Sequence, residues 1–185
     1  MPYVTYFVIA LAIINYFRLY KLRQKESEDL ALMDAGALQT PYIGGWKECY
    51  RLVTAAFVHM SFYHLFMNIY CLYSLGSTLE YLFGSTDFAI ILFGSIILGN
   101  AFTILLGGNE HAISGGLSSG IYGLLATEII IYYLFYGISG IIGNTSLLIT
   151  ILINIAFNFM PGVGWRAHLG GACFGALFIA AIYYF

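Results

Sequence analysis

Gly115-Gly116-Leu117-Ser118-Ser119-Gly120-Ile121-Tyr122-Gly123 is a glycine-dense turn that leads directly into an apolar segment ending near Tyr136. Glycines around the turn allow other backbone to come close to the Ser118 hydroxyl. A serine hydroxyl becomes a good nucleophile only when a neighbouring base takes its proton. Of the four histidines, His168 lies near the start of the last apolar segment, in Trp165-Arg166-Ala167-His168-Leu169-Gly170-Gly171. We therefore predict that Ser118 and His168 form a nucleophile and base pair inside a membrane protein.

The amino-acid composition is that of a membrane protein. Of the 185 residues, 61% are hydrophobic and 9% are charged, whereas a soluble domain carries about 25% charged residues. The mean hydropathy is +0.85. The net charge of −2 and the lack of a basic stripe in the sequence argue against a nucleic-acid partner. The three cysteines are an odd number, so we expect no disulfide framework.

Six apolar segments come close to the length of about 20 residues that a helix needs to cross a bilayer. They are residues 2–20, 61–83, 87–106, 118–136, 144–159 and 165–185. The first is followed rather than preceded by basic residues, which is typical of a spanning helix and not of a signal peptide. We expect an all-α, polytopic bundle of six transmembrane helices that forms a single domain over residues 1–185. Residues 21–60 would be its long first loop, and the other connections, including residues 137–143, would be short turns.

The polar residues of the apolar segments gather on one side of the predicted bundle. With six crossings, the second, fourth and sixth segments all begin on the side of the long loop. His64, Asn68, Ser118 and His168 each lie within about 10 Å of that side at a rise of 1.5 Å per residue. Such groups usually face the bundle interior or a water-filled cavity. They therefore predict one polar pocket that opens to the side of the long loop.

Small residues recur at a spacing of four in two places. Gly171 and Gly175 lie in the last segment, and Gly116 and Gly120 lie around the start of the fourth. Pairs of this kind allow membrane helices to approach one another closely. His168 falls on the stripe of Gly171 and Gly175, so we expect the fourth and sixth helices to pack together and bring its imidazole within reach of the serine.

Four stretches of the chain carry a recognisable order of motifs. They are Glu48-Cys49-Tyr50-Arg51-Leu52-Val53-Thr54 with Phe57 and His59, then His64-Leu65-Phe66-Met67-Asn68 with Gly76 and Glu80, then Gly116-Leu117-Ser118-Ser119-Gly120 with Tyr122-Gly123, and finally Ala167-His168-Leu169-Gly170-Gly171 with Gly175. In this order, and at these helix starts, the chain resembles the rhomboid family of intramembrane serine proteases over nearly its whole length. Tyr50 stands where the family usually has Trp.

The resemblance implies a role for each residue of the predicted pocket. Ser118 would be the nucleophile and His168 the general base, in a dyad without a third carboxylate. His64, Asn68 and the Ser118 backbone N–H would bind the oxyanion, and Tyr122 would pack on the imidazole. The substrates would be transmembrane segments of membrane proteins, which would enter beside the fifth helix and be cut near the outer interface through an acyl-enzyme. We expect no cofactor and no metal.

Several polar residues leave alternatives open. Ser118 alone could be a helix N-cap, since Ser is favoured there. Ser119 supplies a second hydroxyl, but the two side chains lie about 100° apart around a helix, so only one can face His168. Glu128 lies about 15 Å along the helix axis from Ser118, too far to orient the imidazole. It is either a buried neutral carboxyl or a group with a substrate or proton role, and His111 has no partner that the sequence identifies.

Other polar residues near the loop have structural interpretations. Glu48 and Arg51 are three residues apart, which favours an ion pair that shapes the long loop. His59 is expected to anchor the loop by hydrogen bonds. Glu80, at the far end of the second segment, is expected to anchor the turn that follows it.

Rival functions make demands that this sequence does not meet. A zinc intramembrane protease needs a His-Glu-x-x-His run, and an aspartyl protease needs two intramembrane aspartates; the sequence has neither. No internal repeat of the kind found in many transporters is present. The serious alternative is an inactive rhomboid relative that binds membrane proteins as a chaperone. Such relatives usually lack the serine or the histidine, and both are present here.

The orientation in the membrane is the point on which resemblance and charge disagree. The resemblance implies a cytoplasmic N-terminus and a long loop and active site that face outward, and we place the protein in the bacterial cell membrane on that basis. All seven basic residues fall on the side of the long loop, which the positive-inside rule would make cytoplasmic. Membrane lipid and membrane-protein substrates are the expected partners.

Overall fold

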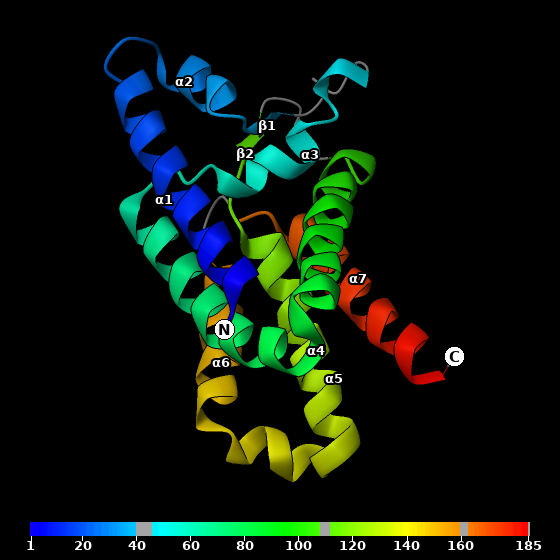
Figure 1. Ribbon diagram of the computed structural model, residues 1–185. Helices are drawn as coiled ribbons and strands as arrows, with labels where there is room; N and C mark the ends of the chain where they lie inside the picture. The colour runs from blue at the N-terminus through cyan, green and yellow to red at the C-terminus, as the bar shows by residue number, and fades with distance from the viewer. Residues whose placement is uncertain (40–45, 108–111, 160–162, 185) are drawn as a thin grey trace.

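The computed structural model describes residues 1–39, 46–107, 112–159 and 163–184 and shows a helical bundle (Figure 1). The long helices are α1 (Tyr3–Leu22), α4 (Phe62–Leu105), α5 (Ser118–Gly143), α6 (Thr145–Asn158) and α7 (Trp165–Tyr184). Four of them, α1, α4, α5 and α7, are long and apolar enough to cross a membrane, and α6 is a shorter apolar helix. The prediction of an all-α membrane bundle is confirmed.

Single glycines divide the two longest helices. Gly84 has φ +77° and bends the 44 residues of α4, so residues 62–83 and 85–105 correspond to the second and third predicted segments. Gly137 has φ +64° and bends α5 in the same way. Only glycine adopts this backbone conformation without a steric penalty. Residues 137–143, which we predicted as a turn, are helical instead, because the helix resumes after one left-handed residue and the apolar run continues it.

The long first loop is built from short elements rather than irregular chain. These are α2 (Glu28–Asp34), β1 (Leu38–Gln39), η1 (Trp46–Glu48), α3 (Arg51–Thr54) and η2 (Ala55–Phe57). Strand β1 pairs antiparallel with β2 (Ile113–Ser114), in the connection that leads into α5, with Leu38 opposite Ser114. These elements gather at one end of the bundle, and the bend between α5 and α6 lies at the other (Figure 1). The loop is therefore attached directly to the chain just before Ser118.

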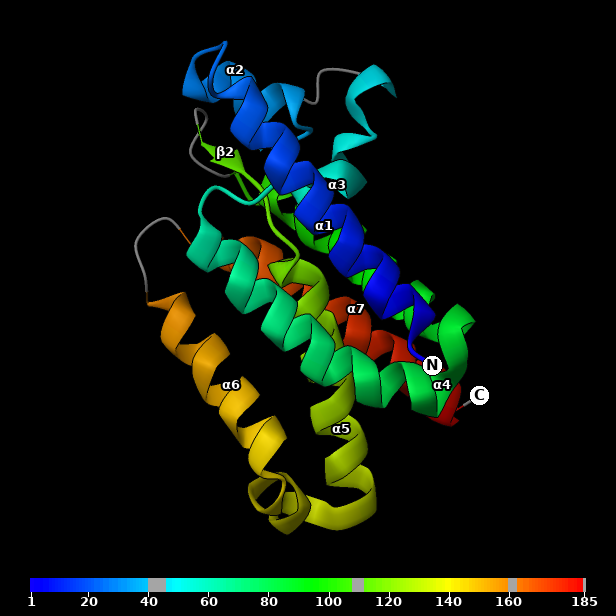
Figure 2. The same cartoon turned by 60° about the vertical axis from the view of Figure 1, so that its left-hand side comes forward.

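Helix α5 lies at the centre of the bundle, between α4 and α7, while α1 packs on the first half of α4 (Figures 1 and 2). Its buried apolar residues join those of α4 in one core, which includes Leu72, Phe88, Ile96, Ile121 and Leu124. Helix α6 lies at the periphery, beside α5 and the first half of α4. It reaches α4 through a hydrogen bond of 3.1 Å between Ser146 and Ser74.

Glycines on α7 determine how closely it approaches α5. A Cβ added at Gly171 would lie 1.9 Å from the Ser119 carbonyl oxygen, and one added at Gly175 would lie 2.1 Å from that of Gly123. Both distances are far below a van der Waals contact, so any larger residue would force the helices apart. The predicted packing role of Gly171 and Gly175 is confirmed.

Gly116 does not take part in such a helix contact. Its φ of +126° places it outside α5, and a Cβ there would lie 2.7 Å from the His64 ring. The expectation that Gly116 and Gly120 form a helix-packing pair is therefore wrong, because the chain turns sharply before the helix starts. Gly120 does pack closely, against Leu92 and Ile96 of α4.

Arg51 organises the interior of the long loop. Its guanidinium forms an ion pair with Glu48 and donates to the carbonyl oxygens of Met33 at 2.6 Å and Ala37 at 2.9 Å. Only 8% of Arg51 is exposed. The loop-shaping ion pair expected from the sequence is present, and the same side chain also joins the end of α2 to α3.

His59 connects the long loop to the start of α5. The ring is fully buried, and its Nε2 accepts a hydrogen bond of 3.5 Å from the Leu117 backbone N–H. Its Nδ1 lies 3.4 Å from the Phe57 carbonyl oxygen, to which it donates. Burial, and to a lesser extent the neighbouring His64, lower the pKa of His59 to about 3. The ring is thus a neutral anchor next to the Ser118 turn.

Glu80 joins three parts of the fold with one carboxylate. It accepts hydrogen bonds from the backbone N–H groups of Val4 at 2.8 Å and Thr5 at 2.9 Å, from the Thr5 hydroxyl at 2.8 Å and from the Ser85 hydroxyl at 2.6 Å. The first N–H groups of a helix have no partner within the helix. Glu80 therefore caps α1 and, through Ser85, also anchors the chain beyond the bend of α4, as the sequence predicted.

Replacing Glu80 by Gln is expected to destabilise the fold. The residue is 3% exposed, and in either orientation the amide NH₂ of Gln would face a backbone N–H, that of Val4 or Thr5, which can only donate. Leaving one buried donor without an acceptor costs about 1–3 kcal/mol. Thermal unfolding in detergent should therefore show a lower melting temperature for Glu80→Gln. Thr78→Ala, at an exposed position of the same helix, is the matched control, and equal melting temperatures for the two variants would contradict the capping role.

Stability should also fall as the pH drops below about 6.5, the usual pKa of His. The unfolded chain takes up a proton on His59 near that pH, whereas the folded protein does so only near its pKa of about 3. The unfolded state therefore binds more protons in this window, and this residue alone removes up to about 1.4 kcal/mol per pH unit. His59→Gln should make the melting temperature less dependent on pH between 6.5 and 4.5. An unchanged slope would show that the ring is not the titrating group.

Candidate active site

Ser118 is the first residue of α5 and follows a turn that the long loop holds on two sides. The Gly116 N–H donates to the Ala55 carbonyl oxygen at 2.9 Å, and the Leu117 N–H donates to His59. Leu117, not Ser118, occupies the N-cap position. The serine hydroxyl is therefore not used to cap the helix, which removes the simplest structural explanation for this residue.

The structure brings Ser118 and His168 into contact. Ser118 Oγ lies 3.0 Å from His168 Nε2, within hydrogen-bond distance. His168 is in the first turns of α7 and is 7% exposed, while Ser118 is half-buried. The close packing of α5 on α7 produces this contact, since Gly171 lies one turn after His168 against the backbone of Ser119.

Ser119 faces away from the imidazole. Its side chain is 1% exposed and lies at the contact with Gly99 of α4, whose added Cβ would be 2.6 Å from Ser119 Cβ. Its hydroxyl has no hydrogen-bond partner among the described residues. Of the two adjacent hydroxyls, only that of Ser118 reaches His168.

Tyr122 covers one face of the imidazole. Its ring lies 4.0 Å from that of His168, centroid to centroid, with an angle of 7° between the planes. Tyr122 is one turn after Ser118 on α5, so the serine and the ring that covers His168 come from the same face of one helix. Its hydroxyl donates to the Asn154 carbonyl oxygen of α6 at 2.7 Å.

Asn158, the last residue of α6, contacts the other nitrogen of His168. Asn158 Oδ1 lies 2.7 Å from His168 Nδ1. Within the described ranges, no Asp or Glu forms an ion pair with this histidine. Asn158 was not identified from the sequence. As a polar residue at the end of the fifth predicted segment, it lies on the same side as the other polar groups. Its position in the sequence does not indicate which residue it contacts.

His64 and Asn68 lie in the first two turns of α4. The His64 ring packs edge-on against that of His59, with centroids 5.0 Å apart, and contacts the backbone of Gly116. No ring nitrogen of His64 has a hydrogen bond to another described residue. In Asn68, the NH₂ donates to the His64 carbonyl oxygen at 2.8 Å, and the buried Oδ1 has no hydrogen-bond partner among the described residues. The structure thus places His64 at the Ser118 turn, whereas the amide of Asn68 is turned toward its own helix.

The remaining candidates lie away from this cluster. Glu128 is buried in α5, 5% exposed, and its carboxyl forms no hydrogen bond to another part of the chain that the structure describes. His111 lies outside the described residues. Among those that are described, no three His, Cys, Asp or Glu residues are close enough to hold a metal ion.

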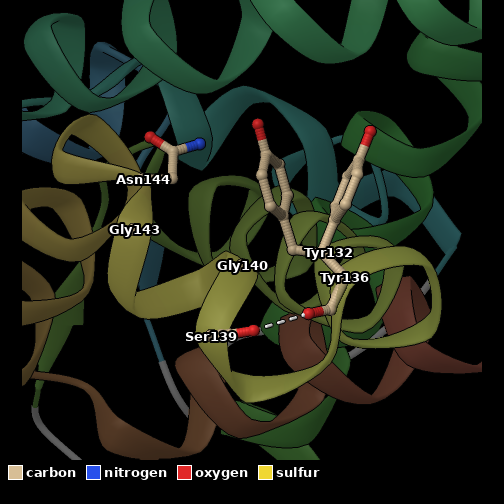
Figure 3. A pocket seen from close by; sticks show the side chains of 6 residues that line it. All are labelled: Tyr132, Tyr136, Ser139, Gly140, Gly143 and Asn144. Carbon is tan, nitrogen blue, oxygen red and sulfur yellow. Dashed lines mark hydrogen bonds between the residues drawn. The ribbon is translucent and has the colours of Figure 1, made fainter.

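A large surface hollow lies at the opposite end of α5. It has a volume of about 500 Å³ and is lined by Tyr132, Tyr136, Ser139, Gly140, Gly143 and Asn144. The two tyrosine rings lie side by side with their hydroxyls pointing the same way (Figure 3). Tyr132 is about 21 Å along the helix from Ser118 at 1.5 Å per residue. This open hollow is therefore separate from the cluster around the serine.

Comparison with known proteins gives relatives that carry rhomboid names, three of which are described here. RHOMBOID-like protein 7 of Arabidopsis thaliana is 32% identical over 139 residues, which cover 74% of this chain and 44% of the relative. Rhomboid protease GluP of Bacillus subtilis (strain 168) is 28% identical over 187 residues, covering 97% of this chain and 34% of the relative. Inactive RHOMBOID-like protein 8 of Arabidopsis thaliana is 28% identical over 150 residues, covering 76% and 42%.

These relatives are longer than the chain and differ in activity. The chain spans less than half the length of each of the three. One is named a protease and another is named inactive, so proteins similar to this chain include both kinds. The Rhomboid domain matches residues 47–185, which include every residue of the cluster described above. Because that match covers well over half of the sequence, the chain belongs to the rhomboid family.

Proposed function

We propose that the chain is an intramembrane serine protease in which Ser118 is the nucleophile and His168 the general base. The observation that carries the proposal is the distance of 3.0 Å between Ser118 Oγ and His168 Nε2. Two such groups within hydrogen-bond reach are the arrangement that activates a serine for acyl transfer. The long apolar helices around them support a location of this chemistry in a membrane.

The proposed reaction has two steps. Ser118 Oγ attacks the carbonyl carbon of the scissile peptide bond while its proton moves to His168 Nε2. The tetrahedral intermediate then collapses, the C–N bond breaks, and the leaving amine takes the proton from His168. In the second step, His168 removes a proton from water, the hydroxide attacks the acyl-enzyme ester, and Ser118 recovers its proton as the carboxylic acid leaves.

The oxyanion of this intermediate needs donors close to the nucleophile. The Ser118 backbone N–H is in the first turn of α5, where helix N–H groups have no acceptor within the helix, and none of its described neighbours accepts from it. The His64 ring lies against Gly116 and has unused hydrogen-bonding capacity. We assign both to the oxyanion site, and Asn68 joins them after its amide rotates away from the His64 carbonyl. Each well-placed donor contributes about 2.7–4 kcal/mol to the transition state.

The proposed substrates are transmembrane segments of other membrane proteins. The peripheral position of α6 supports access to the serine from the membrane beside this helix. A helical substrate must unwind to expose its peptide bond, so small or helix-breaking residues near the cleavage point are expected. Membrane lipid is the surrounding partner, and neither cofactor nor metal is needed for the proposed reaction.

The second candidate function is that of an inactive rhomboid that binds membrane proteins as a chaperone. The relative named Inactive RHOMBOID-like protein 8 is 28% identical, the same value as for the GluP protease. Only the contact between Ser118 and His168 favours the protease over this alternative. A reactive serine is therefore the property that distinguishes the two functions.

Ser118→Ala is expected to lower kcat for cleavage of a transmembrane test substrate in detergent by more than about a thousandfold. Labelling by a fluorophosphonate probe should disappear in the same variant. Ser119→Ala is the matched control and should keep both, because that hydroxyl faces α4. If Ser119 rather than Ser118 is required, the assignment of the nucleophile is wrong. A folded wild-type protein that neither cleaves nor reacts with the probe would favour the inactive binding protein.

We further propose that residues 1–185 form one domain in a bacterial cell membrane, with the active site facing outward. The similarity to a Bacillus subtilis protein supports the compartment, whereas the seven basic residues on the side of the long loop oppose this orientation. A reporter fused after α7, which runs away from the long loop toward its C-terminal end (Figure 1), should be active in the cytoplasm. A reporter active only outside the membrane would reverse the orientation.

A further inference from the structure

We infer that Asn158 is a positioning residue that holds His168 in the one neutral tautomer able to act as a base. The inference rests on the proposed function and adds a third residue to the proposed dyad. It comes from a chain of hydrogen bonds that links α5, α6 and α7 at the level of Ser118.

The chain runs from the backbone of α6 to the serine. The Tyr122 hydroxyl lies 2.7 Å from the Asn154 carbonyl oxygen, and Asn158 Nδ2 lies 2.5 Å from the Tyr122 hydroxyl oxygen. Asn158 Oδ1 then lies 2.7 Å from His168 Nδ1, and His168 Nε2 lies 3.0 Å from Ser118 Oγ. Each link has donor and acceptor within hydrogen-bond distance.

The hydrogen bond between Tyr122 and the Asn154 carbonyl determines which group donates and which accepts in every other bond of the chain. A backbone carbonyl can only accept, so the single Tyr122 proton points to Asn154. The Tyr122 oxygen must then accept from the NH₂ of Asn158, which turns the amide oxygen of Asn158 toward His168. That oxygen can also only accept, so Nδ1 carries the proton and Nε2 is left with its lone pair facing Ser118.

The alternative orientation of the Asn158 amide would leave the contact between Tyr122 and Asn154 without a hydrogen bond. If the Asn158 amide were flipped, its oxygen would need the Tyr122 proton, and its NH₂ would face an unprotonated Nδ1. The Tyr122 and Asn154 oxygens would then face each other at 2.7 Å with no proton between them. Nε2 would carry the ring proton and donate to Ser118, so the imidazole could not take the serine proton. The observed network excludes this tautomer.

Asn158 therefore supplies the function that a carboxylate supplies in a Ser-His-Asp triad, without a charge. In such triads the third residue orients the imidazole and selects its tautomer. A neutral amide at the exposed end of α6 does the same here. Asn158 does not touch the reacting atoms and acts only through His168.

The test replaces Asn158 by Leu, which has a similar size but cannot accept a hydrogen bond, and by Asp, which still can. In Asn158→Leu, kcat for a transmembrane test substrate should fall by about ten- to hundredfold, less than the whole contribution of a general base, while KM stays within about twofold. Asn158→Asp should recover much of the lost kcat. ¹⁵N NMR of the labelled histidines, with His168 assigned by its own substitution, should show protonated Nδ1 in the wild type and in Asn158→Asp, and a mixture of tautomers in Asn158→Leu.

The controls separate positioning from a general weakening of α6. Phe159→Ala removes a ring that is 85% exposed and adjacent to Asn158, and it should leave the tautomer of His168 unchanged. An unchanged tautomer in Asn158→Leu, or an Asp variant no better than Leu, would overturn the inference. The proposed function fails separately: it requires that Ser118→Ala lose cleavage, whereas the NMR measurement reports the tautomer whether or not the protein is active.

Discussion

The structure depends on the close contact between α5 and α7. Helices in lipid gain no hydrophobic energy from associating with each other, so their packing relies on van der Waals contact between surfaces that fit. Here the carbonyl oxygens of Ser119 and Gly123 lie where side chains at Gly171 and Gly175 would otherwise be. The spacing of four residues repeats on both helices, so the contact sets their depth and rotation together. The 3.0 Å approach of Ser118 and His168, just before these contacts, is a consequence of that register.

A second constraint holds the serine end of α5 from the side of the long loop. Strand β2 pairs with β1, the Gly116 N–H donates to Ala55, and the Leu117 N–H donates to the buried ring of His59. These contacts lie within five residues of Ser118. The loop thus determines where the helix starts, while the glycines of α7 determine which way its first turn faces. Neither constraint alone would place the hydroxyl.

Much of this arrangement could be read from the sequence, because periodic apolar segments and four-residue glycine spacing have direct structural meanings. The helices, the close approach at Gly171 and the contact of Ser118 with His168 followed from such patterns. The helix over residues 137–143 did not, since one glycine looked like the start of a turn and only the backbone shows that it merely bends the helix. Asn158 could not be assigned either, because its partner lies on another helix, and the separation along the chain says nothing about which faces meet. The amide direction of Asn68 is likewise a property of side-chain rotation, which no spacing predicts.

The proposed base and the residue that we propose to orient it belong to helices with very different packing. His168 lies on α7, which is locked against α5 by backbone contacts that tolerate no side chain, while Asn158 ends α6 at the edge of the bundle. Under our proposal, the imidazole has a fixed position, whereas its tautomer is set from a peripheral helix. Tyr122 connects the two, since it stacks on His168 at 4.0 Å and exchanges hydrogen bonds with α6 through its hydroxyl. The proton on Nδ1 is consequently defined only while the end of α6 stays against Tyr122, so the position of this helix bears on the proposed chemistry as well as on access to it.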